Sequence, residues 1–290
     1  MKKIFISGVT VLEFIFHLDA IPRVFEKYRT KNAFISGGGN AANASVAISK
    51  LGGKAYLASR IGDDELSKII INDLKKDGVN LKFLKICKKK KTSFSSVYIN
   101  ENGERQVVNF ADSTMPLSCN WIKNLPNFNA YLTDAKWIEG ALFTLRKAKI
   151  NNVPGIIDIE EKIDINLIKN ASHITFSLNG LRRNTSITNI KNALKKIRNM
   201  TSSWICVTDG ENGVYFFEQN KIINLKPKNI NAKDTLGAGD VWHGAFALSL
   251  SEGKNEYESV IFANTAATIK CKGLGGRESY PLRSQLERFF

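Results

Sequence analysis

The sequence predicts an α/β protein built around a mostly parallel sheet, and three observations support this prediction. Short apolar runs typical of buried strands recur along the chain, and they alternate with segments of helical periodicity. Such alternation is typical of parallel strands joined by crossover helices. The chain has 290 residues, 43% of them hydrophobic, and no repeat, low-complexity segment or proline-rich linker divides it. We therefore expect one domain over residues 1–290.

Strands and helices are expected to alternate in the first third of the chain. Residues 2–8 form a β-branched and aromatic run that ends in glycine, as an opening strand would. Residues 40–53 carry small residues at helical spacing before a Gly-Gly stop, and residues 63–78 have an acidic first turn and a terminal glycine. Both segments are predicted to be helices, with a strand at residues 54–62 between them.

Two β insertions are expected at about residues 11–36 and 92–113. The second has alternating residues on both sides of Asn102-Gly103, which predicts a hairpin. The insertions hold more apolar residues than one face of a thin sheet can bury against its own domain, and such exposed edges favour a partner. We therefore predict a homodimer in which these segments pack together. The alternative is a lid that folds down onto its own active site.

The second half of the chain also alternates between strand-like and helical segments. The predicted strands and helices are, in chain order, the strand 130–134, the helix 138–151, the strands 155–159 and 173–177, the helix 187–200 and the strand 203–210.

The charge of the chain leaves two classes of partner open. The formal net charge is +15 and the pI is about 9.6, which suits either nucleic acid or a small anionic substrate. Most basic residues are scattered lysines, and the one dense run, Lys88 to Lys91, is typical of a solvated turn. No zinc-finger spacing or aromatic RNA-binding signature accompanies that run, so nucleic-acid binding is the less favoured class.

The chain is expected to be a cytoplasmic protein that does not bind membranes. Its apolar N-terminal run soon meets acidic residues and lacks a small-residue cleavage site, so it favours a buried strand over a secretion signal. No uncharged apolar stretch is long enough to span a bilayer. The cysteines lie far apart and form no CxxC pair, which favours free thiols in a reducing compartment. They are Cys87, Cys119, Cys206 and Cys271.

Three glycine-bearing segments are candidates for binding. Residues 37–43 (GGGNAAN) lead into a predicted helix, and a tight turn explains them as well as a binding site does. Residues 207–217 (VTDGENGVYFF) read as a hairpin or as a ligand-binding turn at the end of a strand. Residues 234–250 (DTLGAGDVWHGAFALSL) are the most informative, because glycines there open a helix and can point successive N–H groups at one anion. Asp240 beside them suits a proton acceptor.

In this order and spacing the three segments resemble the ribokinase (PfkB) family of ATP-dependent sugar kinases. The likeness covers nearly the whole chain and is most specific in DTLGAGDVWHGAF. It implies a three-layer α/β/α fold with a small β-sheet lid, ATP and Mg²⁺ as cofactors, and a small sugar as substrate. By resemblance the catalytic residues are Asp240 as base and Gly237, Ala238 and Gly239 as anion hole. The nucleotide would contact Thr208, Gly210, Gly213, Asp234, Thr235, Gly237, Gly239, Asn264 and Ala267.

Within the family the chain looks most like the sulfofructose kinase branch, through residues 7–22 and its ending KCKGLGGRESYP. That likeness implies an anionic ketose or sugar acid held by Lys27, Asn109 and Lys136, the last of which stands where the branch has arginine. A lysine keeps the charge and loses the bidentate fork. The full set expected at the substrate is Glu13, Lys27, Gly38, Gly39, Asn43, Asn109, Asp134, Lys136 and Asp240.

Two departures from the family pattern concern the substrate and the metal. Glu13 stands where many relatives have aspartate, and the extra methylene shifts the carboxylate. The N-x-x-E metal motif is replaced by residues that include Ser177 and Gly180, so Mg²⁺ is expected to depend on ATP phosphates, water and Asp158 in an outer shell. The leading hypothesis is therefore an ATP-dependent sugar kinase. A nucleoside kinase of the same fold and a sensor that has lost phosphoryl transfer are the alternatives.

Overall fold

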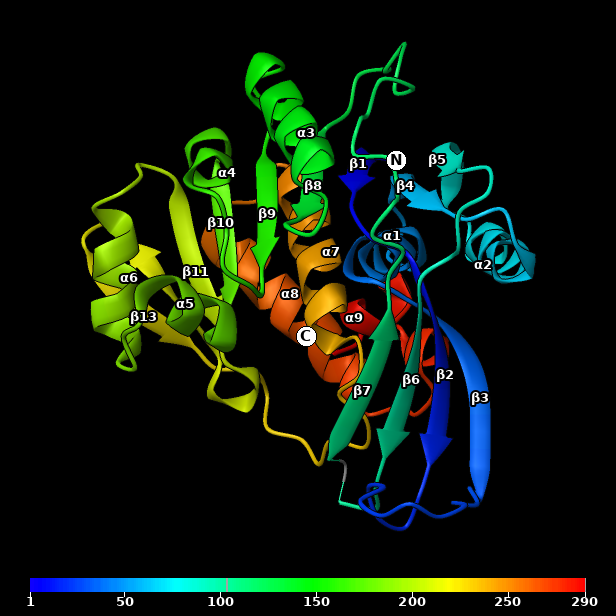
Figure 1. Ribbon diagram of the computed structural model, residues 1–290. Coiled ribbons are helices and arrows are strands. Elements are labelled where there is room, and N and C mark those ends of the chain that lie inside the picture. The colour runs from blue at the N-terminus through cyan, green and yellow to red at the C-terminus, as the bar shows by residue number, and fades with distance from the viewer. Residues whose placement is uncertain (103, 290) are drawn as a thin grey trace.

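The computed structural model describes residues 1–102 and 104–289 and contains two sheets (Figure 1). The nine-stranded sheet has the order β13-β12-β11-β10-β9-β8-β1-β4-β5. All neighbours from β11 to β5 pair parallel, and only the edge pairs β11–β12 and β12–β13 of this sheet are antiparallel. Its strands are β1 (Lys3–Ser7), β4 (Lys54–Ile61), β5 (Asn80–Ile86), β8 (Ala130–Asp134), β9 (Gly155–Ile159), β10 (His173–Ser177), β11 (Trp204–Thr208), β12 (Val214–Glu218) and β13 (Lys221–Leu225).

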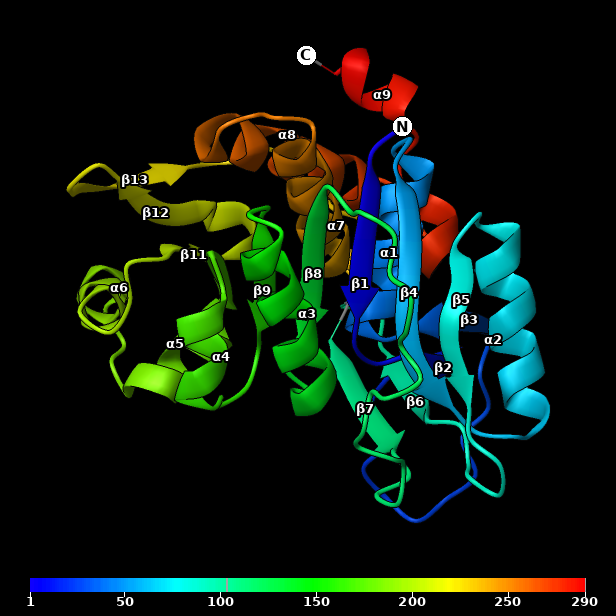
Figure 2. The same ribbon diagram turned by 90° about the horizontal axis from the view of Figure 1, so that it is seen from above.

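Helices cover both faces of the large sheet (Figure 2). The α/β prediction is confirmed, and the helices predicted at 138–151 and 187–200 are present with slightly narrower bounds. The helices are α1 (Asn40–Lys50), α2 (Glu65–Lys76), α3 (Ile138–Ile150), α4 (Ile165–Asn170), α5 (Leu178–Thr185), α6 (Ile190–Arg198), α7 (Ala238–Ser251), α8 (Glu256–Cys271) and α9 (Arg283–Glu287), with short 3₁₀ turns at η1 (Gly210–Asn212) and η2 (Gly276–Ser279).

Alternate residues of the buried strands supply two opposite cores, as the period of a strand requires. In β11, Cys206 packs with α1, α7 and α8, whereas Ile205 and Val207 pack with α3 to α6. In β1, Ile4 joins the first core, and Phe5 joins an aromatic cluster on the other face. Both faces of the sheet are therefore apolar, which is why its strands read as near-continuous hydrophobic runs in the sequence.

The second sheet has the order β3-β2-β6-β7 and projects from the carboxyl-terminal edge of the large sheet (Figure 1). Its central strands pair parallel, and the outer pairs are antiparallel. The glycine of the predicted Asn102-Gly103 turn lies outside the described residues. The strands are β2 (Val11–His17), β3 (Asn32–Gly38), β6 (Phe94–Ile99) and β7 (Arg105–Phe110). Because β1 leads directly into β2, this sheet stands over the ends of the parallel strands.

Helices α1 and α7 approach each other closely at a glycine. A Cβ on Gly244 would lie 2.6 Å from the carbonyl oxygen of Ala44, which is too close for any side chain. This contact brings the first turn of α1 beside the first turn of α7. Both helices therefore begin at the same place, between the two sheets.

Three further expectations concern membrane spans, disulfides and the segment 207–217. In the described part of the chain, no helix combines the length and the apolar character needed to cross a membrane. The four cysteines, all of them described, form no disulfide. The segment 207–217 is a hairpin, since β11 and β12 pair antiparallel across η1.

Candidate active site

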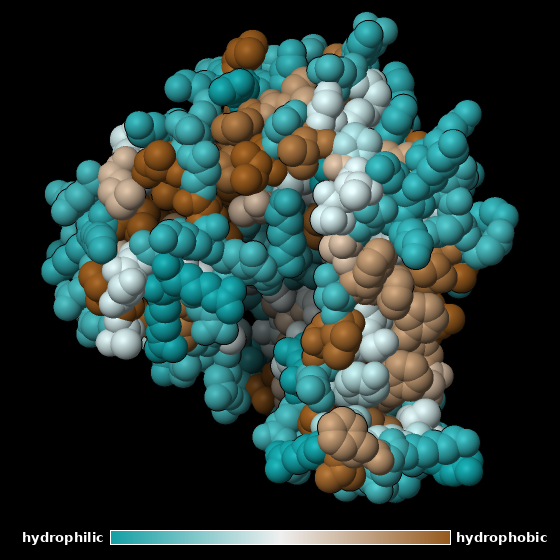
Figure 3. All heavy atoms as spheres, viewed as in Figure 1, coloured by the Kyte–Doolittle hydropathy of each residue, from teal (hydrophilic) through white to brown (hydrophobic). Residues whose placement is uncertain are grey.

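A cavity of about 770 Å³ lies between the two sheets, at the carboxyl ends of the parallel strands. The space-filling view shows the molecule hollowed between its larger body and the projecting sheet (Figure 3). This is the edge at which open α/β sheets bind ligands. Of the residues expected at substrate or cofactor, the cavity is lined by Glu13, Gly39, Asn43, Asn109, Lys136, Thr235, Gly237, Gly239 and Asp240.

The first turn of α7 forms one wall of the cavity. Gly237 precedes the helix with a φ of 75°, a left-handed conformation that favours glycine. Gly237 and Gly239 line the cavity, where the positive end of the helix dipole favours an anion. Ala238 was also expected to contribute its N–H to this anion hole. Its N–H donates to the carbonyl oxygen of Thr235 at 3.2 Å, and the residue does not line the cavity.

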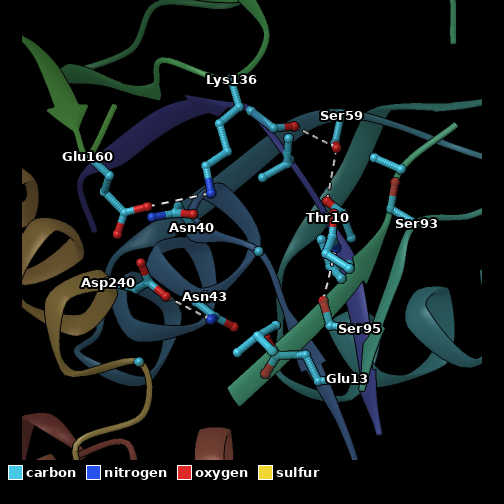
Figure 4. A pocket seen from close by; sticks show the side chains of 18 of the residues that line it. Thr10, Glu13, Asn40, Asn43, Ser59, Ser93, Ser95, Lys136, Glu160 and Asp240 are labelled. Atoms are coloured by element: carbon cyan, nitrogen blue, oxygen red, sulfur yellow. Dashed lines mark hydrogen bonds and ion pairs between the residues drawn. The ribbon is translucent and has the colours of Figure 1, made fainter. Parts of the chain in front are cut away.

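Asp240 faces the cavity from the same turn, beside α1 (Figure 4). Its Oδ2 accepts a hydrogen bond of 2.7 Å from Nδ2 of Asn43. Burial raises the pKa of the Asp240 carboxyl to about 7, and the charges of Glu160 and Glu13 add to the rise while the Asn43 hydrogen bond opposes it. At neutral pH this carboxyl is therefore poised to exchange a proton.

Arg277, in η2, fixes Asn43 and was not singled out from the sequence. Its Nε donates to Oδ1 of Asn43 at 2.9 Å, and its Nη1 forms an ion pair of 2.8 Å with Asp73 of α2. A third donor reaches the carbonyl oxygen of Gly38 at 3.3 Å. Since the amide oxygen of Asn43 is held by Arg277, its amide nitrogen must face Asp240. The sequence does not reveal this pair, because the two residues are 234 positions apart.

The projecting sheet supplies a second wall. Glu13 of β2, Ser95 of β6 and Asn109 of β7 are register partners in a row across this sheet. Nδ2 of Asn109 donates to Oγ of Ser95 at 2.9 Å. Burial raises the pKa of the Glu13 carboxyl, although the nearby cations Arg277, Arg105 and Lys136 oppose this rise. Gly38 does not line the cavity, and a Cβ there would lie 2.4 Å from the carboxyl carbon of Glu13.

The ends of β8 and β9 supply the third wall. Lys136 lies 3.4 Å from Glu160, and both line the cavity (Figure 4). Burial alone would lower the pKa of Lys136, but the charges of Glu160 and Asp134 outweigh it and raise the pKa. Asp134 was expected at a sugar hydroxyl, and the structure places it elsewhere. Its carboxylate is buried and accepts the N–H groups of Val9 and Lys136, at 2.7 and 3.0 Å.

Lys27 was expected over the substrate, and the structure does not place it there. It lies in the loop between β2 and β3, with Phe25 and Tyr28, on a hollow separate from the cavity. The loop follows the end of β2 that points away from the large sheet (Figure 1). About four residues of extended strand separate Glu13 from that end, a distance of roughly 13 Å.

The remaining residues expected at the nucleotide lie outside the cavity. Gly213 and Asn264 meet at Leu225: the Nδ2 of Asn264 donates to its carbonyl oxygen at 3.1 Å, and a Cβ on Gly213 would lie 2.5 Å from the same atom. Asn264 also accepts a hydrogen bond of 2.8 Å from Nε1 of Trp242. Asp234 forms an ion pair with a lysine of α8. This group outside the cavity consists of Thr208, Gly210, Gly213, Asp234, Asn264 and Ala267.

The fit of Mg²⁺ can be tested at the ends of β9 and β10. A Cβ on Gly180 would lie 2.0 Å from the carbonyl oxygen of Ile159, so no carboxylate can extend from that position. Asp158 is buried, and its Oδ1 has no hydrogen-bond partner among the described residues. Its other oxygen accepts from Asn40 at 3.1 Å. Together with Glu160 on the cavity wall, these oxygens suit a hard cation that takes its other ligands from phosphate and water.

Comparison with known proteins agrees with this geometry. The chain matches the pfkB family carbohydrate kinases over residues 1–283. It is 23% identical to a ribokinase of Bacillus subtilis over 99% of both chains, and 26% identical to a ribokinase of Dictyostelium discoideum over 98% of this chain and 99% of that one. A crystal structure of ribokinase from Thermotoga maritima superposes with a TM-score of 0.86, at 24% identity, over 100% of this chain and 99% of that one.

The three-layer α/β/α architecture, with its smaller sheet over the carboxyl ends of the parallel strands, is the ribokinase-like fold. The chain belongs to the pfkB family of carbohydrate kinases. It is an ATP-dependent sugar kinase and uses ATP with Mg²⁺.

The titration of Asp240 provides a direct test of this site. Its carboxyl should titrate near pH 7, and Asn43→Ala should move the midpoint to higher pH because a hydrogen bond to the charged form is lost. Carbon-13 NMR of labelled aspartate measures both, with Asp240→Asn to assign the signal. Asn109→Ser, which leaves the contact to Asp240 intact, is the control. A midpoint near 4 in the parent protein would contradict the prediction.

Proposed function

We propose that Asp240 is the general base of sugar phosphorylation and that the turn at Gly237 and Gly239 binds the transferred phosphoryl group. The observation that carries this proposal is the position of Asp240 on the first turn of α7, with a pKa of about 7 and its carboxylate held by Asn43. A base works best when its pKa lies near the working pH. The amides beside it lie where negative charge would grow during transfer.

Each residue contributes a definable part of the reaction in this mechanism. Oδ1 or Oδ2 of Asp240 accepts the proton of the sugar hydroxyl as that oxygen attacks the γ-phosphorus of ATP in line with the leaving ADP. Arg277 and Asn43 hold the carboxylate in place before the sugar arrives. Glu160 and Asp158 are the residues that would hold Mg²⁺, which would neutralise charge on the phosphates when bound.

Removing the carboxylate tests the catalytic proposal. Asp240→Asn should lower kcat by at least ~10²–10⁴-fold, the usual contribution of a general base, while nucleotide affinity stays nearly unchanged. Coupled-enzyme assays and calorimetry with a non-hydrolysable ATP analogue measure the two quantities. In the parent protein kcat/KM should rise with pH through about 7, because the base must be deprotonated. Near-normal turnover of the variant would remove Asp240 from this role.

The substrate is proposed to be a ketose or sugar acid that carries an anionic group, as in the sulfofructose kinase branch. Lys136 and Asn109 line the cavity and support this proposal. Arg60 adds a third donor group that the sequence analysis did not identify. Its guanidinium lies 4.4 Å from the centroid of the Trp137 ring, and its Nε has no hydrogen-bond partner among the described residues. A guanidinium and an ammonium that line the same cavity favour a sulfonate, phosphate or carboxylate.

A substrate panel tests this specificity. The parent enzyme should prefer an acidic sugar to its neutral analogue by at least ~10-fold in kcat/KM, and Lys136→Met should reduce that preference. Lys169→Met is the matched control, because Lys169 is an exposed lysine in the last turn of α4 and does not line the cavity. The panel pairs fructose with sulfofructose, fructose phosphates and keto-deoxy sugar acids, and it includes nucleosides. Equal turnover of neutral sugars would contradict the anionic subsite, and preferred turnover of a nucleoside would favour a nucleoside kinase.

The whole chain is proposed to act as one kinase domain whose smaller sheet is the lid, and two lids are proposed to pair in a homodimer. Apolar side chains on the lid stay exposed in a single copy, among them Ile35 at 53% and Val108 at 59%. Hydrophobic residues are visible on the lid in Figure 3.

The protein is also proposed to be cytoplasmic, and its unpaired cysteines support this location.

The dimer predicts a particular mass in solution. Light scattering at micromolar concentration should give twice the chain mass of 32.3 kDa. Val108→Glu should shift the protein toward the monomer, because a charge at a buried interface is costly to desolvate. Ile150→Glu, an exposed apolar residue at the end of α3, is the control. A monomeric mass for the parent protein would refute the dimer.

A further inference from the structure

Lys270 has no place in the reaction as described above, and yet its side chain is fully buried. Burying an ammonium is costly unless it is paired and hydrogen-bonded. Lys270 lies in the last turn of α8, and its Nζ contacts a single residue twice. It lies 2.9 Å from Oδ2 of Asp234 and donates to the main-chain oxygen of Asp234, also at 2.9 Å.

Asp234 connects Lys270 to a residue on the wall of the cavity. Its second carboxylate oxygen, Oδ1, accepts a hydrogen bond of 2.8 Å from the N–H of Leu236. Leu236 lines the cavity and immediately precedes Gly237, at which the turn before α7 adopts its left-handed conformation. The N–H of Lys233 also donates to the carbonyl oxygen of Cys271 at 2.8 Å. The segment before the turn is therefore anchored to the end of α8 by both side-chain and main-chain bonds.

The charges at this anchor matter because of where it lies. A carboxylate that directly precedes an anion-binding turn has the wrong sign, since it would repel a phosphate oxygen over a short distance in a partly desolvated site. The side chain of Asp234 is only 17% exposed, so water screens it weakly. The ammonium of Lys270 lies against it and cancels its charge.

We propose that Lys270 is a positioning residue for phosphoryl transfer: it holds the turn at residues 235–239 in its anion-binding shape and neutralises Asp234 beside it. This inference rests on the proposed function of that turn. Lys270 acts through Asp234 and touches no reacting atom. The ammonium of Lys270 is therefore a permanent positive charge beside the residue that precedes this turn.

Removing the ammonium leaves a space that still presents the carboxylate and carbonyl oxygens of Asp234. Lys270→Ala should lower kcat by at least ~10-fold, a smaller effect than that of removing an anion-hole donor outright. The KM for sugar should change by less than about threefold, because the sugar wall of the cavity is untouched. Ammonium or methylammonium chloride should restore kcat by about threefold or more, and tetramethylammonium chloride, too large for the space and without an N–H, should not.

Lys196→Met is the matched control. The Nζ of Lys196 also donates to a carbonyl oxygen, that of Thr185 at 3.0 Å, far along the sheet from the cavity. Its kcat should not change, with or without ammonium. Circular dichroism and thermal unfolding establish whether each variant is folded.

A second pair of variants keeps the inference testable if Lys270→Ala does not fold. Lys270→Met leaves Asp234 uncompensated, whereas Lys270→Met with Asp234→Asn removes both charges, and kcat should be at least about threefold higher in the double variant. Normal kcat in Lys270→Ala, or a loss with neither ammonium rescue nor recovery in the double variant, overturns the inference. Asp240→Asn separates the two proposals, because normal turnover of that variant would instead overturn the function on which this inference rests.

Discussion

The close contact between α1 and α7 is the constraint on which the rest of the site depends. Because Gly244 has no side chain, the two helices approach until Gly244 lies against the backbone of Ala44. Asn43 and Asp240, each in the first turns of its helix, then come within 2.7 Å of each other. A larger residue at position 244 would separate the helices and with them the carboxylate from its donor. The contact that packs α1 against α7 in the core therefore also sets the distance between Asn43 and Asp240.

Charge is arranged in compensated groups around the cavity, in a chain with a net charge of +15. Asp73 pairs with Arg277, Glu160 with Lys136, and Asp234 with Lys270. Asp240 is different, because its described partner is the neutral amide of Asn43. A carboxylate without a cation beside it keeps a high pKa in a buried place. Of these four carboxyl groups, Asp240 is the one without an ion pair, and its pKa of about 7 suits it to exchange a proton at neutral pH.

Local patterns predicted the fold and the glycine turns well, because they follow from neighbours in sequence. The strands at 130–134, 155–159 and 173–177 lie where their apolar runs indicated. The residues that the sequence did not reveal depend on contacts between distant positions. Arg277 meets Asn43 across 234 positions, and Lys270 meets Asp234 across 36. The position of Lys27 depends on the length and direction of β2. The alternation of apolar and polar residues predicts a strand but does not specify either of these.

The strand β7 has a consequence for how this enzyme can change over evolutionary time. It is an edge strand, exposed along its whole length, and yet it carries Arg105, Val107 and Asn109 on the cavity wall. Residues in such a strand contribute little to the core, so most substitutions there have small effects on stability. New substrates can therefore be selected by changes in this one strand, while the carboxylate and the glycine turn of α7 remain as they are.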